Sequence, residues 1–241
     1  MTKASFSFLS PLLTDLTRRA AFIGRASEVP TSTDKEETLS LLRPTHQAAA
    51  DALGFKQTHL AEQVHGVDLA IVEKSSPLMT PGVDGLLTSK ADCLLGIHVA
   101  DCGALYLADS RTGALGLLHS GKKGTEGNIL GSAILKMGDH FGTSPADLTV
   151  VLAPCIRPPH YEIDFAATIR EQALAAGILA SNYHDEGLCT ASHLDQFYSY
   201  RIEKGNTGRM LALLGTISEE VCSSQGPLKH SSFPVQISNL P

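Results

Sequence analysis

Three short apolar runs in the middle of the chain constrain its fold more than any other feature. They cover residues 93–100, 102–109 and 114–118. Each run has the length of a strand, and the turn-forming residues Asp109 to Gly113 separate the last two, which predicts an antiparallel hairpin. Residues 148–152 predict another buried strand, and residues 57–73 predict extended strands with a turn near Gly66. The chain is therefore expected to build its core around β-sheet.

Helical periodicity appears between and around these strands. The predicted helices cover residues 44–53, 129–141 and 164–176. Pro44 suits the first turn of its helix, and Gly54 and Gly177 are typical residues at which a helix stops. The polar segment 30–37 predicts a loop. Clusters of strands with interspersed helices indicate an α+β fold, with mixed β-sheets flanked by helices in one compact domain.

The domain organisation is expected to be simple. We find no internal repeat and no linker, so residues 1–241 predict a single domain with its core at about residues 20–217. Residues 218–241 lack periodicity, and we expect them to form a partly disordered tail.

Composition and charge argue against several classes of protein. The formal net charge is -6, which disfavours broad attraction to nucleic acid or to an anionic membrane. No stretch approaches the ~18 apolar residues that span a bilayer, and the charges near the N-terminus follow its apolar segment in the wrong order for a secretory signal. Five widely spaced cysteines without a CxxC pair do not suggest a disulfide framework. We expect a cytoplasmic protein that binds a small molecule.

Three residues at predicted strand ends are candidates for chemistry. His65 precedes a glycine that permits a sharp turn, Cys102 begins one strand, and His119 ends the next. Cys102 and His119 flank the predicted hairpin, so their side chains are expected to be neighbours across its open end. Asp101, as a strand residue beside Cys102, should point to the other face of the sheet. Spacing alone leaves a functional and a structural role open for the Cys102–His119 pair.

Most other histidines and cysteines need no functional explanation. The histidines expected at the solvated surface are His46, His59, His140, His184, His193 and His230. Cys93 and Cys155 are expected to be small buried apolar residues.

The loop after His119 has features that suit an anion. Gly121, Gly124 and Gly127 bracket Lys122 and Lys123, and a helix follows. Backbone N–H groups at a helix N-terminus and two ammonium groups would suit phosphate, although the loop is not a Walker motif. A solvated basic turn is an equally good interpretation of these residues.

Several ordered motifs resemble those of the YfiH family, also called the polyphenol-oxidase or laccase-domain family. They are Gln63-Val-His-Gly66, Val83-Asp-Gly-Leu-Leu-Thr88, Ala100-Asp-Cys102, His119-Ser-Gly-Lys-Lys-Gly124, Ala153-Pro-Cys-Ile-Arg-Pro-Pro-His-Tyr-Glu162, Cys189-Thr190, Phe197-Tyr-Ser-Tyr-Arg201 and Thr207-Gly-Arg209. The resemblance extends over roughly residues 20–217 and implies the same α+β fold.

The resemblance implies a zinc ion held by His65, Cys102 and His119. Three N and S ligands leave a fourth position for water or substrate, which is the pattern of a catalytic zinc site, and zinc lowers the pKa of bound water from ~15.7 to about 7. The implied activities are phosphorolysis of the purine nucleosides adenosine, inosine and methylthioadenosine, and deamination of adenosine. The resemblance also implies that Arg25, Gln63, Lys122 and Lys123 contact substrate or phosphate. Arg201 and Arg209 match closing motifs, with pairing to Glu162 or Asp164 as an equal alternative.

The chain also departs from the family pattern, and alternatives remain open. Lys122-Lys123 replaces Trp-Arg, and a lysine cannot make the bidentate contact of an arginine or stack on a purine. The alternatives are a metal-free Cys–His hydrolase or deamidase with Cys102 as nucleophile, a copper-dependent polyphenol oxidoreductase, and a non-catalytic protein that binds purine or phosphate. We prefer zinc to copper, because the sequence lacks the repeated HxH motifs of multicopper oxidases. The oligomeric state does not follow from the sequence.

Overall fold

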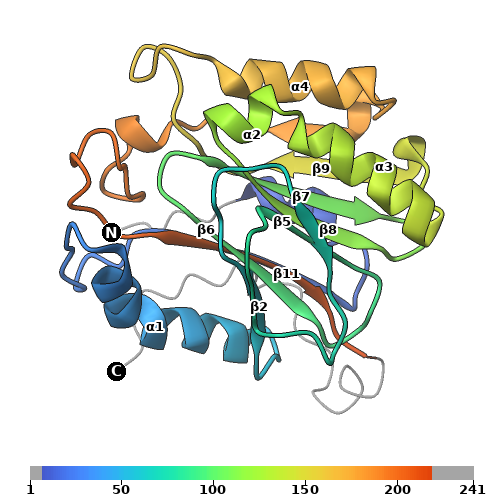
Figure 1. Cartoon of the computed structure of the whole chain (residues 1–241), viewed down its shortest axis with the longest axis horizontal. Coiled ribbons are helices and arrows are strands. Elements are labelled where there is room, and N and C mark those ends of the chain that lie inside the picture. The colour runs from blue at the N-terminus through green and yellow to red at the C-terminus, as the bar shows by residue number, and fades with distance from the viewer. Residues whose placement is uncertain (1–6, 219–241) are drawn as a thin grey trace.

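Two β-sheets pack face to face, with helices on both outer surfaces (Figure 1). The computed structural model describes residues 7–218. The first sheet has the order β1 (Arg18–Ile23), β11 (Met210–Thr216), β6 (Leu94–Val99), β2 (Thr58–Ala61) and β4 (Met79–Thr80). The second has the order β10 (Tyr183–Asp185), β9 (Leu148–Leu152), β7 (Gly103–Asp109), β8 (Leu115–Ser120), β5 (Gly85–Thr88) and β3 (Leu69–Ile71). Both sheets contain parallel and antiparallel pairs, which confirms the predicted α+β fold with mixed sheets.

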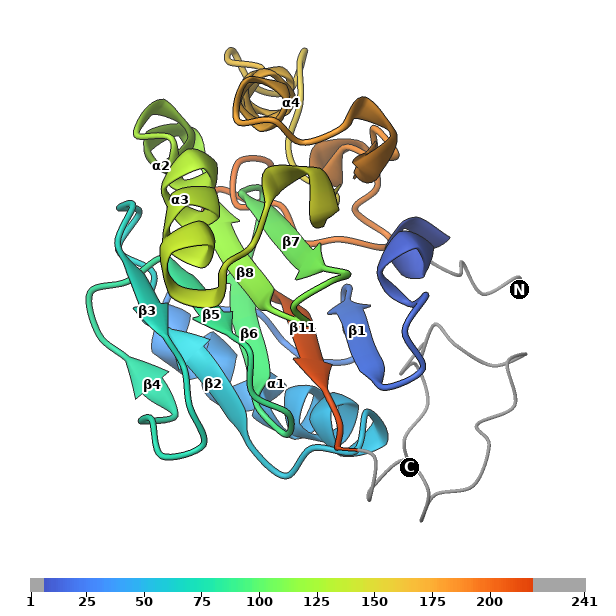
Figure 2. The same ribbon diagram turned by 90° about the vertical axis from the view of Figure 1, so that its right-hand side faces the viewer.

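The helices cover the two outer faces of this sandwich. The α-helices are α1 (Lys35–Ala52), α2 (Lys122–Glu126), α3 (Ile129–Phe141) and α4 (Phe165–Ala175), and the short 3-10 helices are η1 (Ser7–Leu12), η2 (Pro145–Asp147), η3 (Ala180–Asn182) and η4 (Thr190–Ser192). Figure 2 shows α1 beside the first sheet, and α2, α3 and α4 on the opposite side of the molecule. No helix of residues 7–218 is both long and apolar enough to cross a membrane.

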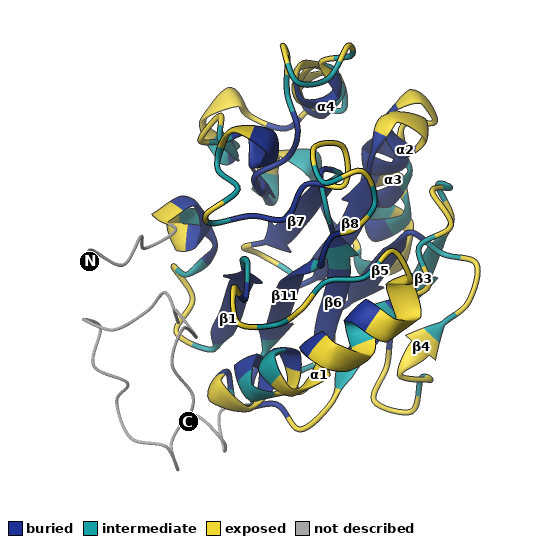
Figure 3. Cartoon of the chain, turned by 90° about the vertical axis from the view of Figure 1, so that its left-hand side faces the viewer, coloured by how far each residue is buried: buried dark blue, intermediate teal, exposed yellow. Residues whose placement is uncertain are grey.

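Alternation along the central strands divides the core into layers. In β6, Leu95 and Ile97 pack between the two sheets, whereas Leu94 packs on the α1 side. In β7, Tyr106 faces the first sheet and Leu107 faces the layer that contains α3 and α4. The strands are therefore buried on both faces, while α1 keeps one exposed face (Figure 3).

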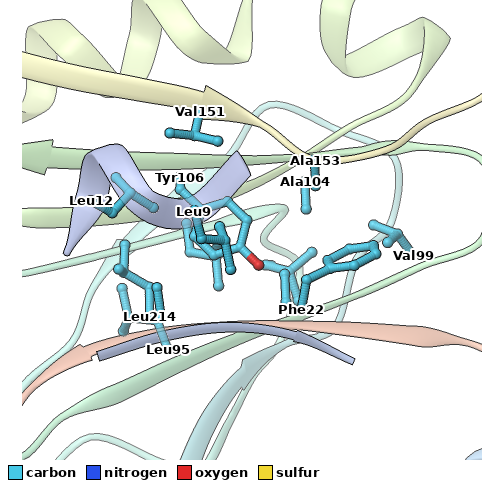
Figure 4. Packing of buried hydrophobic residues seen from close by; sticks show 14 of the residues in the cluster. Leu9, Leu12, Phe22, Leu95, Val99, Ala104, Tyr106, Val151, Ala153 and Leu214 are labelled. Carbon is cyan, nitrogen blue, oxygen red and sulfur yellow. The ribbon is translucent and has the colours of Figure 1, made fainter. Parts of the chain in front are cut away.

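Tyr106 joins the two sheets through the middle layer. Its side chain packs among residues such as Leu95 and Val151, and its hydroxyl donates a hydrogen bond to the Ala21 carbonyl in β1 at 2.7 Å (Figure 4). Burying a large side chain of this kind contributes about 1.5–3 kcal/mol, and the hydrogen bond satisfies the one polar atom that would otherwise be costly in this layer.

Most predicted elements are confirmed, but the first helix begins earlier than predicted. The β7–β8 hairpin, β9, α3 and α4 lie where their patterns placed them. The segment 30–37 is not a loop throughout, because α1 begins at Lys35. The Asp34 side chain caps its N-terminus by accepting hydrogen bonds from the backbone N–H groups of Glu36 and Glu37. Pro44 therefore lies inside the helix. Of the predicted tail, residues 219–241 lie outside the described residues.

Two histidines that we expected at the surface are buried. His46 in α1 and His59 in β2 face the interior, and the His46 ring lies 5.2 Å from the His98 ring, measured between centroids. Burial lowers the pKa of His46 to about 4, so the ring is neutral at pH 7. The expectation was wrong because polar sequence neighbours do not report which face of an amphipathic helix or strand a residue occupies.

Candidate metal centre

His65, Cys102 and His119 come together at one edge of the sandwich. One ligand atom of each lies within 4.8 Å of the others, and the two imidazole rings are 4.8 Å apart between centroids at an interplanar angle of 80°. Among residues 7–218, this is the one group of three His, Cys, Asp or Glu side chains close enough to share a metal ion. His119 is buried, Cys102 is partly buried and His65 is exposed, so the group lies near the protein surface rather than inside the core.

The loop that carries His65 is shaped by a buried carboxylate. Gln63 and His65 both have left-handed backbone, with φ of 66° and 63°. The Asp84 side chain, which is 0% exposed, accepts hydrogen bonds from the backbone N–H groups of Val64 (3.1 Å), His65 (2.9 Å) and Gly66 (2.7 Å). These three contacts offset the strained conformation and fix the position of His65.

Asp84 also orients His119. The His119 ring donates from Nδ1 to Asp84 Oδ1 at 2.7 Å, and the backbone N–H of His119 donates to the Asp84 carbonyl, also at 2.7 Å. Burial alone would raise the pKa of Asp84, but the hydrogen bonds from His119 and the loop lower it below its usual value. With Nδ1 committed to this carboxylate, Nε2 of His119 is left to act as a ligand, as in many metal sites.

Cys102 lies in the turn between β6 and β7, directly before β7 begins. Gly103 pairs with Ser120, so Cys102 stands opposite Gly121 at the open end of the hairpin. Burial raises the pKa of the Cys102 thiol, but hydrogen bonds from His119 and His65 and the charges of these rings lower it to about 6. The thiol is thereby poised to lose its proton, which both a metal ligand and a nucleophile require.

A cavity of about 630 Å³ opens beside the three side chains. Its lining includes Tyr161, Phe165 and Tyr200, whose rings offer flat apolar surface, together with His65, Cys102 and His119. A volume of this size suits a small molecule with one or two rings.

Asp101 differs from our expectation. It borders the cavity instead of pointing away from it, because its φ of 83° is left-handed and the alternation of an extended strand does not apply. Its carboxylate is nevertheless engaged, since Oδ1 accepts from the Thr190 hydroxyl and Oδ2 from the Arg201 N–H, each at 2.7 Å. Through these hydrogen bonds, Asp101 connects the segments that contain Thr190 and Arg201 to the edge of the cavity.

The remaining sequence-predicted contacts are only partly brought together. Gln63 and Lys122 line the cavity, and the Gln63 side-chain amide bonds both backbone groups of His98. Lys123 is exposed and is not part of the lining. Arg25 also lies outside the lining, where it pairs with Glu203 at 2.7 Å and stacks on Tyr198.

The two arginines of the closing motifs both line the cavity. Arg201 pairs with Glu162 at 3.1 Å, as one of the two interpretations required. Arg209 makes no ion pair with a carboxylate of residues 7–218 and lies over the Tyr200 ring.

The sequence patterns did not predict Asp84, Lys35 or His98 as parts of the site. Asp84 lies in a motif that carried the family resemblance, and a carboxylate directly before a buried strand was the available signal. Lys35 and His98 line the cavity from α1 and β6. No sequence pattern pointed to these two residues as part of a site. The helix α1 was expected to begin nine residues later, and His98 resembled any other strand residue.

The donor set fits a bound metal ion. One thiolate sulfur and two imidazole nitrogens suit zinc, and a three-residue set would leave a fourth position for water or substrate. Asp84 supplies the carboxylate–histidine hydrogen bond that commonly supports such ligands. The His65, Cys102 and His119 side chains could therefore hold one metal ion.

Comparison with known proteins identifies the family. The family model described as multi-copper polyphenol oxidoreductase laccase matches residues 29–166 and 160–217. The chain therefore belongs to this family, which agrees with the resemblance to YfiH proteins in its motifs.

Relatives and solved structures agree with this assignment. The chain is 32% identical over 196 residues to a protein named purine nucleoside phosphorylase YlmD from Geobacillus stearothermophilus, covering 66% of this chain and 72% of the relative. It is 33% identical over 192 residues to a purine nucleoside phosphorylase from Deinococcus radiodurans, covering 69% and 74%. The crystal structure of the Geobacillus YlmD superposes with a TM-score of 0.75 at 27% identity, covering 86% of this chain and 94% of that one. Bacillus licheniformis YfiH, at 22% identity, has a TM-score of 0.70 and covers 78% and 85%, which shows the shared fold.

Proposed function

We propose that this protein is a zinc-dependent enzyme that phosphorolyses purine nucleosides. The observation that carries the proposal is the His65–Cys102–His119 group at the wall of a cavity of about 630 Å³ that is lined by aromatic and cationic side chains. Two relatives that are at least 32% identical to this chain are named purine nucleoside phosphorylases, which supports the substrate class.

Phosphorolysis requires a site that binds both phosphate and the purine nucleoside. A phosphate oxygen bonds to the ribose C1′, the C1′–N9 bond breaks, and the proton given up by phosphate ends on the departing purine. Zinc, when held by His65, Cys102 and His119, supplies a Lewis acid beside the cavity. The cations of the lining hold the phosphate, and the rings of Tyr161 and Tyr200 offer surfaces on which a purine can stack.

Deamination of adenosine is a second candidate for the same site. A zinc deaminase uses a carboxylate that is not a ligand to move protons. Among the described residues that line the cavity, the one carboxylate is Asp101, and both of its oxygens already accept hydrogen bonds. This arrangement favours phosphorolysis over deamination.

The other candidates are weaker. The lowered pKa of Cys102, at about 6, suits the nucleophile of a metal-free hydrolase or deamidase. Such a dyad needs one histidine, however, whereas both His65 and His119 approach the thiol. A multi-copper oxidase requires several metal centres, and residues 7–218 offer one. A non-catalytic binding protein remains the alternative if the site binds purine without turnover.

The assay that tests the proposal incubates the full chain with adenosine, inosine or methylthioadenosine, with and without inorganic phosphate. We expect free purine base and a ribose 1-phosphate product only when phosphate is present, and loss of turnover after treatment with a chelator. Cys102→Ala should be inactive, whereas Cys93→Ala, the same change in the core between the sheets, should retain activity. Inosine formed from adenosine without phosphate would instead identify deamination. Turnover that persists in the metal-free protein would contradict the role of the metal.

A further inference from the structure

The cavity carries an excess of positive charge. The cations in its lining are Lys35, Lys122, Arg201, Lys204 and Arg209. The one carboxylate among the described lining residues, Asp101, is engaged by Thr190 and by the Arg201 backbone. Five cations therefore border one cavity in a chain whose net charge is -6, and this concentration of positive charge points to an anionic ligand.

Most of these cations lack a counter-ion in the part of the chain that the structure describes. Arg201 pairs with Glu162, but none of the other four makes an ion pair with a carboxylate of residues 7–218. Arg25 provides the contrast, because it lies outside the cavity lining and is paired with Glu203. Four of the five basic residues in the cavity lining are thus without an ion-pair partner among residues 7–218.

The Arg209 guanidinium is fixed in a position in which it can bind an anion. Its Nη1 donates to the carbonyls of Thr207 (3.3 Å) and Gly208 (2.8 Å), and its guanidinium lies 5.7 Å from the centroid of the Tyr200 ring. These contacts fix the group, while Nε and Nη2 have no hydrogen-bond acceptor among residues 7–218. Burial lowers the pKa of Arg209, which reflects the cost of keeping this charge partly buried without an anion.

Lys35 and Arg209 lie around His98. Burial and, to a smaller extent, the neighbouring His46, Lys35 and Arg209 together lower the pKa of His98 to about 3. The His98 ring is therefore neutral at pH 7 and keeps one N–H that can donate to an anion. Its position is fixed, because the Gln63 side chain bonds both backbone groups of His98.

Lys204 approaches the cavity from a rigid loop. Its backbone is left-handed, with φ of 52°. The neighbouring Glu203 carboxylate accepts hydrogen bonds from the Ser199 N–H (3.0 Å) and the Thr207 hydroxyl (2.6 Å). This loop leads directly to Arg209, so Lys204 and Arg209 belong to one short, ordered segment at the cavity rim.

We propose that Lys35, Lys204 and Arg209, together with the ring of His98, form a subsite for a phosphate group. A guanidinium with two free donor nitrogens matches two oxygens of a phosphate, and the two ammonium groups supply point charges. The ligand is either inorganic phosphate or the phosphate ester of a nucleotide. The first case rests on the proposed function, since phosphorolysis requires phosphate and Arg25 and Lys123, two of the contacts implied by the resemblance, do not line the cavity.

Direct binding of inorganic phosphate to the zinc-loaded full chain, measured by titration calorimetry, tests this subsite. We expect Arg209→Gln to raise the dissociation constant for phosphate about 10- to 100-fold, because a charge-assisted contact is lost. Lys204→Gln, at an exposed side chain, should raise it about 3- to 10-fold without threatening the fold. Lys90→Gln, at an exposed lysine outside the cavity lining, is the matched control, and we expect no change there. The zinc content and unfolding curve of each variant are measured on the same samples.

A second arm distinguishes the source of the phosphate. If the ligand is a phosphate ester, the wild-type chain binds adenosine monophosphate more tightly than adenosine, and Arg209→Gln abolishes the difference. Unchanged affinities for both inorganic phosphate and the nucleotide in folded Arg209→Gln and Lys204→Gln would overturn the subsite. Binding and turnover are measured separately, so the two proposals can fail independently. If both variants keep the wild-type affinity for phosphate and still phosphorolyse nucleosides, the subsite is rejected and the proposed function stands. Phosphate binding that depends on Arg209 without any turnover rejects the proposed function alone.

Discussion

Asp84→Asn is expected to destabilise the protein by about 2–5 kcal/mol and to weaken metal binding about 10- to 100-fold. Each carboxylate oxygen accepts two hydrogen bonds: Oδ1 from His65 N and His119 Nδ1, and Oδ2 from Val64 N and Gly66 N. Asparagine has one oxygen and one NH₂ group, so two of the four donors face another donor in either orientation. Each unsatisfied buried donor costs about 1–3 kcal/mol.

The loss of metal affinity has a separate cause. Without the Asp84 carboxylate, His119 is no longer held with its proton on Nδ1, and the loop that carries His65 loses the contacts that stabilise its left-handed backbone. Chemical denaturation and zinc titration of the same samples measure the two effects. Asp139→Asn, an exposed change in α3, serves as the control and should shift stability by less than about 0.5 kcal/mol. Wild-type stability and zinc affinity in Asp84→Asn would show that this carboxylate does not organise the site.

Gly121→Ala should separate metal binding from folding. A Cβ at this position would lie 2.5 Å from Cys102 Sγ, which is too close, so the thiol would have to leave its present position. The backbone φ of -94° is normal for alanine, so the strain falls on this contact. We expect zinc affinity to fall by at least about 100-fold, because moving a ligand should cost no less than losing its outer hydrogen bond.

Zinc competition with a chromogenic chelator, run beside an unfolding curve, measures this prediction. Gly138→Ala is the matched control, since its added Cβ would come no nearer than 3.4 Å to the Thr143 carbonyl. The unfolding midpoint of Gly121→Ala should stay close to that of the wild type. Wild-type zinc affinity in Gly121→Ala would mean that Cys102 is not a ligand in the position described.

Local patterns were enough to predict much of the fold. The β7–β8 hairpin and α3 are encoded by alternation and by helical spacing within their own residues, so they could be located from sequence. The start of α1 was misplaced, because Pro44 resembled a first-turn proline and outweighed the capping signal of Asp34. A tertiary context that tolerates proline inside a helix is not visible in a local pattern.

The site was predictable only in part, because its supporting contacts are distant in sequence. His65, Cys102 and His119 were proposed from strand ends and motifs. Asp84, which holds two of them, lies 19 residues from His65 and 35 from His119. Arg25 was expected at the substrate, but its partner Glu203 is 178 residues away. The left-handed backbone of Asp101 likewise depends on contacts that no short motif contains.

We propose above that His65, Cys102 and His119 form one zinc site. Elemental analysis of protein purified without chelator, for the wild type, Cys102→Ala and the core control Cys93→Ala, tests it most directly. We expect about one zinc per chain in the wild type and in Cys93→Ala, and loss of that zinc in Cys102→Ala. No zinc in the wild type, or the same zinc content in Cys102→Ala, would rule out this zinc site and leave Cys102 to act as a nucleophile.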